Sequence, residues 1–116
     1  MILNESLLNA AKNGDLSGVK AALKKGADIT AKNKVDMTAL MLASAKGHTD
    51  VAELLIKNGA DVDAKDNKGW TALMFASSEG HTDIAKLLIE NGVDVNVKDK
   101  DGMTALMYAS FDEHTD

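Results

Sequence analysis

Two patterns of apolar and polar residues succeed one another along this chain. In residues 50–57 and 83–90 the apolar side chains recur at the spacing of one helix face, whereas in residues 60–64 and 93–97 apolar and polar residues alternate one by one. The first pattern predicts amphipathic helices, and the second predicts short extended arms. The helix positions that we expect in the core are Val51, Leu54, Leu55, Ile84, Leu87 and Leu88.

An alanine-rich helix is expected before each of these amphipathic helices, over residues 39–46 and 72–79. Thr38 and Thr71 stand at the N-caps, where a hydroxyl oxygen accepts a hydrogen bond from a free backbone amide. Gly47 is expected to end the first of these helices with a positive φ. Each unit is therefore predicted to be a pair of antiparallel helices followed by an extended arm.

This unit recurs with a period of 33 residues. Met37–Gly69 and Trp70–Gly102 carry the same residue at 21 of 33 aligned positions. A period of this length is typical of stacked repeat proteins, in which a unit buries its apolar face against its neighbours. The sequence therefore predicts a single domain, residues 1–116, built by stacking.

The two ends of the chain match the repeat less well. At the N-terminal end, Asn4 is expected to cap a first helix, and a second helix is expected over residues 17–25. At the C-terminal end, only the first helix of a unit is predicted, which indicates either a truncated array or an end face left for a partner. The expected units are a capping repeat 1–37, full repeats 38–70 and 71–103, and a truncated repeat 104–116.

The repeated motifs resemble those of ankyrin repeats. The resemblance rests on Gly-x-Thr-Ala-Leu-Met, Gly-His-Thr-Asp and Asn-Gly-Ala-Asp-Val, which with their variants cover nearly the whole chain. It implies an all-α ankyrin-repeat solenoid of helix-turn-helix units with short extended hairpin arms. Thr-Ala-Leu-Met stands three times where the family usually has Thr-Pro-Leu-His, so that methionine packing replaces polar contacts.

Composition and charge exclude several classes of function. A formal net charge of −5 disfavours binding to the phosphate backbone of nucleic acid, and the absence of cysteine excludes disulfides and thiolate nucleophiles. No apolar run approaches the ~20 residues that a membrane helix needs, and no signal peptide is recognisable. We therefore expect a cytoplasmic protein that engages neither nucleic acid nor membrane.

Recurring histidines and acidic residues do not fit a metal site. His48, His81 and His114 lie one repeat apart, which places them ~8–10 Å from one another in stacked helices, whereas zinc holds each nitrogen at ~2.0–2.1 Å. The resemblance implies instead that each histidine ties its turn to the adjacent repeat. The acidic turns lack the central glycine and the distal glutamate of a calcium loop. We expect no metal and no cofactor.

A catalytic site is also not expected. Catalysis requires a nucleophile, a base and an orienting group that converge in one pocket. The serine, histidine and aspartate residues of this chain occupy repeat positions, so each has equivalents with the same structural task. The sequence therefore predicts a protein that is not an enzyme.

One column of repeat positions carries large apolar residues at the ends of the arms. Met37, Trp70 and Met103 each precede a capping threonine, and the resemblance places them on the concave side of the solenoid. Tryptophan and methionine are enriched at interface centres, so we predict a partner-binding strip around Trp70, with packing between neighbouring arms as the alternative. The other predicted partner-binding residues are Lys34, Val35, Lys46, Asn67, Lys68, Ser78, Glu79, Lys100, Asp101, Phe111 and Asp112.

The predicted function is recognition of an unidentified protein partner by the concave face. Two alternatives stay open: a repeat scaffold, engineered or truncated, without a natural ligand, and weak self-association of the monomer through the C-terminal face. The moderate identity between the full repeats, together with the degenerate first unit, favours a natural array over a consensus design.

Overall fold

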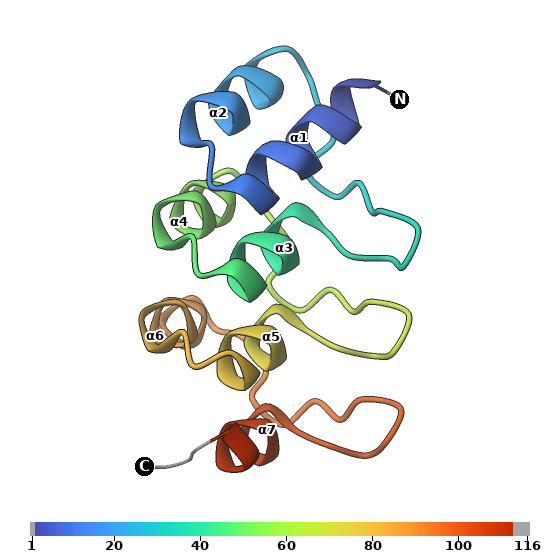
Figure 1. Cartoon of the computed structure of the whole chain (residues 1–116), viewed down its shortest axis with the longest axis vertical. Helices are drawn as coiled ribbons and strands as arrows, with labels where there is room; N and C mark the ends of the chain where they lie inside the picture. Colours follow the sequence, from blue (N-terminus) through green and yellow to red (C-terminus); the bar gives the residue numbers. More distant parts are fainter. Residues whose placement is uncertain (1, 113–116) are drawn as a thin grey trace.

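The computed structural model describes residues 2–112, and in this part of the chain three pairs of helices and a single last helix stack along one axis. They are α1 (Ile2–Asn13), α2 (Leu16–Lys24), α3 (Ala39–Lys46), α4 (Thr49–Lys57), α5 (Ala72–Ser78), α6 (Thr82–Glu90) and α7 (Ala105–Asp112). Figure 1 shows the inner helices α1, α3, α5 and α7 next to the projecting arms, and the outer helices α2, α4 and α6 on the opposite side. The predicted all-α solenoid with hairpin arms is confirmed.

Hydrogen bonds at the helix ends explain where the inner helices begin. Thr38 Oγ1 accepts from the backbone N of Met41, and Thr71 Oγ1 accepts from that of Met74, both at 3.3 Å. Gly47 follows α3 with a φ of 80°. The predicted caps are therefore confirmed, and the limits of α2 to α6 differ from those expected by one residue at most.

Asn4 is not the N-cap that the sequence predicted for the first helix. Helix α1 already includes Ile2, which places Asn4 within its first turn. The Oδ1 atom of Asn4 instead accepts a hydrogen bond of 2.8 Å from the backbone N of Asp28, in the loop after α2. The prediction was wrong because it weighed only the local helix end, whereas most side-chain hydrogen bonds go to whichever backbone group lies in reach.

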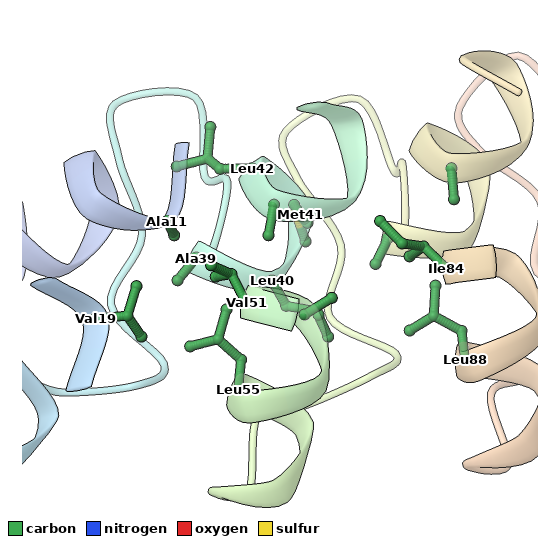
Figure 2. Close-up of a cluster of buried hydrophobic side chains, with 14 of the residues drawn as sticks. Ala11, Val19, Ala39, Leu40, Met41, Leu42, Val51, Leu55, Ile84 and Leu88 are labelled. Carbon is green, nitrogen blue, oxygen red and sulfur yellow. The ribbon is translucent and has the colours of Figure 1, made fainter. Parts of the chain in front are cut away.

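The core runs through the stack between the inner and outer helices. Each outer helix packs mainly on the inner helix of its own repeat (Figure 2). The predicted core positions that are buried are Val51, Leu55, Ile84 and Leu88. These side chains fill the space between the two layers of helices.

Leu54 and Leu87 were also predicted in the core, but both are only half-buried. Leu54 lines a shallow hollow between α2 and α4, together with Leu23 and the polar residue Asn58. Neighbouring outer helices contact each other much less than they contact the inner helices. A position that faces the adjacent outer helix is therefore covered on one side only, which helical spacing alone does not reveal.

Histidines join each turn to the preceding repeat. His48 Nε2 lies 3.0 Å from the carbonyl oxygen of Lys12, and His81 Nε2 lies 3.2 Å from that of Ala45. Because a carbonyl oxygen only accepts, Nε2 is the protonated nitrogen in both contacts. The predicted structural role of these histidines is confirmed, and His114 lies outside the described residues.

Helix α7 exposes residues that its counterparts bury. Leu106 is 75% exposed, whereas Leu40 is 1% and Leu73 is 4% exposed. Helices α3 and α5 each pack against an outer helix and the next inner helix, and neither element follows α7 within residues 2–112. The apolar face of α7 therefore remains uncovered in the described part of the chain.

Candidate functional site

Each arm is a tight turn held by its first residue. Asp66 Oδ1 accepts hydrogen bonds from the backbone N of Lys68 at 2.8 Å and of Trp70 at 2.9 Å. The backbone N of Asp66 in turn donates to the carbonyl oxygen of Trp70 at 2.9 Å. This closure fixes the backbone of Trp70 beside its own arm.

Neighbouring arms are joined by backbone hydrogen bonds. The backbone N of Asn67 donates to the carbonyl oxygen of Val35, and that of Lys100 donates to the carbonyl oxygen of Lys68, both at 3.1 Å. The arms therefore form one continuous wall along the inner helices, on the side where they project in Figure 1. A wall that is hydrogen-bonded along its length presents its side chains in a fixed order.

Three of the four aromatic residues of the chain meet in front of this wall. The ring of Trp70 lies 4.8 Å from that of Phe75 and 4.4 Å from that of Tyr108, measured between centroids, and both pairs are tilted. All three side chains are half-buried, so each keeps part of its surface for contact with solvent or a ligand. We call Trp70, Phe75 and Tyr108 the aromatic cluster; the side chain of Phe111, the fourth aromatic residue, lies outside those described.

The aromatic cluster forms the floor of a groove of about 410 Å³ between the arms and the inner helices. Toward the N-terminal end, a second and more polar hollow of about 640 Å³ lies between α1 and the first arm, where Lys12, Lys32 and Lys34 stand beside Glu5. The residues that line the groove are Val35, Met37, Asp66, Asn67, Lys68, Trp70, Phe75, Asp101 and Tyr108.

The structure brings together part of the predicted strip. Lys34 lines the polar hollow rather than the groove. The predicted residues in the groove wall are Val35, Met37, Asn67, Lys68, Trp70 and Asp101. Those that line neither hollow are Lys46, Ser78, Glu79, Lys100 and Met103, and the side chains of Phe111 and Asp112 lie outside the described residues.

Three groove residues were missed by the sequence interpretation: Asp66, Phe75 and Tyr108. Phe75 and Tyr108 occupy one repeat position, the fourth after the capping threonine, where the preceding repeat has Leu42. That column varies among large side chains, as the column of Met37 and Trp70 does. A comparison of equivalent positions in successive repeats could therefore have pointed to Phe75 and Tyr108.

A buried carboxylate supports the aromatic cluster from below. Asp99 is 7% exposed; its Oδ1 accepts from the backbone N of Asp101 and of Met103, and its Oδ2 accepts from the hydroxyl of Tyr108. Burial raises the pKa of Asp99, but these hydrogen bonds outweigh it and hold the pKa below the ordinary value. The carboxylate therefore stays ionised and fixes the Tyr108 ring against Trp70.

The same contact raises the pKa of Tyr108 to about 12, first through the hydrogen bond to Asp99 and then through burial. Tyr108 is the only tyrosine, so phenolate absorbance is expected to rise with a midpoint near 12 instead of 10.0. In Asp99→Asn the midpoint should fall toward 10.0, because the amide carries no charge and its Nδ2 group, in the place of Oδ2, cannot accept from the hydroxyl. Circular dichroism at each pH verifies that the helices persist; a midpoint near 10.0 in folded wild-type protein would contradict the contact.

Other kinds of site find little support in residues 2–112. No group of three or more histidine, cysteine, aspartate or glutamate side chains in this range is arranged to hold a metal ion. None of the helices described is both long enough and apolar enough to cross a bilayer. The groove is therefore the feature from which a function can be argued.

Comparison with known proteins gives the family. A family model described as ankyrin repeats in three copies matches residues 7–99, which is most of the chain. Two proteins of Rickettsia felis that are named ankyrin repeat proteins are each 37% identical over 51 residues, 44% of this chain and 81% and 77% of their own lengths. Ankyrin repeats are generally non-catalytic modules of protein–protein interaction. With this match and the fold described above, the chain belongs to the ankyrin repeat family.

Proposed function

We propose that the groove binds an extended segment of a partner protein, with Trp70 at the centre of the contact and no chemical step. The observation that carries the proposal is the concentration of aromatic side chains in the groove. A chain with 3% aromatic residues has three of them together, half-buried, in the groove between the arms and the inner helices. Partly exposed aromatic clusters in a hollow are typical of interface hot spots.

The surroundings of the cluster support an extended ligand. The arms form a wall that is hydrogen-bonded between repeats, so little ordering of the protein is required when a partner binds. The groove and the polar hollow both lie between the arms and the inner helices. A segment that follows the wall would therefore meet apolar side chains first and lysines further toward the N-terminal end.

Selection from a random peptide library displayed on phage tests the proposal and requires no identified partner. Peptides are selected on the wild-type protein and counter-selected on Trp70→Met. Methionine stands at this position in the neighbouring repeats, as Met37 and Met103, so the variant is expected to keep the fold. Peptides that need Trp70 should be enriched, and failure to enrich any would count against the proposal.

Trp70→Met is expected to weaken binding of a selected peptide by about tenfold, because tryptophan is the largest side chain among the groove residues and a frequent hot spot of interfaces. The dissociation constant is measured by calorimetry on both proteins. Val35→Lys is a second folded variant, since its counterpart in the next arm is Lys68, and it should also weaken binding. Unchanged affinity in both variants would place the contact elsewhere.

Self-association through α7 is a second candidate function, favoured by the exposed face of that helix. Leu106 and Met107 are 75% and 43% exposed, and a second copy of the chain could cover both. Molecular mass measured over a dilution series should then fall with concentration, and Leu106→Lys should give a monomer throughout. A monomer at every concentration would exclude this candidate.

A further inference from the structure

We infer that the partner segment presents an arginine side chain to the groove, where the guanidinium lies against the aromatic cluster and pairs with the carboxylates of Asp66 and Asp101. The inference rests on the proposed function and adds the chemistry of the anchoring residue. Both carboxylates line the groove together with the three rings. A cation would therefore meet aromatic faces and negative charge in one place.

A difference between two repeats points to a missing hydrogen-bond donor beside Asp66. Asp66 and Asp99 occupy the same repeat position, and each holds its arm through Oδ1. Oδ2 of Asp99 accepts from the hydroxyl of Tyr108, whereas Phe75, the counterpart of Tyr108, has no donor to offer. Asp66 lines the groove, so a donor from a ligand can take the place that the tyrosine hydroxyl takes in the next repeat.

The aromatic cluster adds attraction for a cation. The face of an aromatic ring carries partial negative charge, and arginine is the side chain that most often lies against tryptophan and tyrosine in this way. Among the groove residues described, two are acidic, Asp66 and Asp101, and one is basic, Lys68. The whole chain carries a net charge of −5. The charge of the groove therefore complements a single basic side chain.

Arginine fits these groups better than lysine. Its planar guanidinium stacks on a ring while its N–H groups point outward in the plane toward a carboxylate. The ammonium group of lysine is more strongly hydrated and has no face to stack. An apolar chain of similar length would leave Asp66 without the donor, and an uncharged polar one would offer N–H groups without the positive charge.

The repeats themselves supply conservative variants for the test. Asp66→Asn keeps the arm, because Asn33 holds the first arm through Oδ1 with the same pair of bonds, to Val35 and Met37. Combined with Asp101→Asn, it removes both groove carboxylates at nearly constant shape. The matched control is Asp61→Asn with Asp63→Asn, which removes two exposed carboxylates that line neither hollow and likewise keeps their Oδ1 atoms.

The probes are the N-acetyl amides of arginine, citrulline and norleucine, titrated into isotopically labelled protein. Citrulline has the shape of arginine without its charge, and norleucine is purely apolar. The indole N–H signal of Trp70, the only tryptophan, reports occupancy of the groove. We expect the arginine probe to bind about tenfold more tightly than the other two, and the Asp66→Asn/Asp101→Asn protein to lose that advantage. The control protein should retain it.

Three results would overturn the inference. They are equal or tighter binding of citrulline or norleucine, an arginine affinity unchanged by the loss of both groove carboxylates, and no saturable response to any probe. The proposed function is decided separately by the peptide selection, which depends on Trp70 and not on charge. If the selected peptides had apolar anchors, the groove would still be a binding site, but arginine would not be the side chain that it binds.

Discussion

Leu55→Ala is expected to lower the free energy of unfolding by about 2–5 kcal/mol, the usual loss for a buried leucine. The Leu55 side chain is 0% exposed and points from α4 into the core in Figure 2. Because each repeat is stabilised by the surfaces of its neighbours, a loss of this size removes much of the stability of so short an array. Urea denaturation followed by circular dichroism provides the measurement.

Two changes in the same helix serve as controls for this result. Leu54→Ala, one residue earlier, removes the same atoms from a half-buried position and should cost clearly less. Lys57→Ala removes an exposed side chain and should change stability by no more than about 0.5 kcal/mol. If Leu54→Ala and Leu55→Ala were equally destabilising, the assignment of α4 faces to core and surface would be wrong.

The fold was predictable wherever the cause of a feature lies within a few residues. Thr38 caps α3 by bonding an amide three residues later, and Gly47 ends it through its own backbone conformation. Asn4 and Leu54 were misplaced because their surroundings come from another element, the loop at Asp28 and the helix α2. Periodicity specifies a helix face, but the neighbouring helix decides how much of that face is covered.

The groove was predictable in part for the same reason. Trp70 was predicted because it belongs, with Met37 and Met103, to a column of large apolar residues at the ends of the arms. Phe75 and Tyr108 fit the apolar pattern of an inner helix equally well, so core packing was a sufficient explanation for both. Only the stacking of one repeat on the next brings the ring of Tyr108 to that of Trp70, 38 positions away.

The residues that hold the arms are nearly the same in each repeat, whereas residues that line the groove differ between repeats. Each arm has an aspartate or asparagine whose Oδ1 accepts the same pair of hydrogen bonds from backbone N–H groups. The fourth position after the capping threonine, in contrast, is Leu42, Phe75 and Tyr108 in successive repeats. The hydroxyl of Tyr108 donates to Asp99, whereas Phe75 at the same position offers no donor to Asp66. Ligand preference can therefore vary between repeats while the hydrogen bonds that hold the arms stay the same.

Gly47→Ala is expected to be destabilising by about 2–5 kcal/mol, for two separable reasons. The backbone φ of 80° costs about 1–2 kcal/mol for any residue with a Cβ atom. A Cβ atom would also stand 2.7 Å from Cε1 of His81, which must move and give up its contact with the carbonyl oxygen of Ala45. The second cost arises between repeats, so it tests how strongly the histidine joins them.

Gly59→Ala isolates the first cost, because its φ is 90° and, apart from residue 59 and its two chain neighbours, no atom of the described residues lies within 4 Å of the new Cβ. We expect Gly47→Ala to be more destabilising than Gly59→Ala by about 1–3 kcal/mol, the range for overpacking. In a His81→Ala background the ring is absent, and the two glycine variants should become equal. Urea denaturation of these proteins measures the difference as a double-mutant cycle. Equal losses in the wild-type background would show that the His81 ring moves freely and does not hold one repeat against the next.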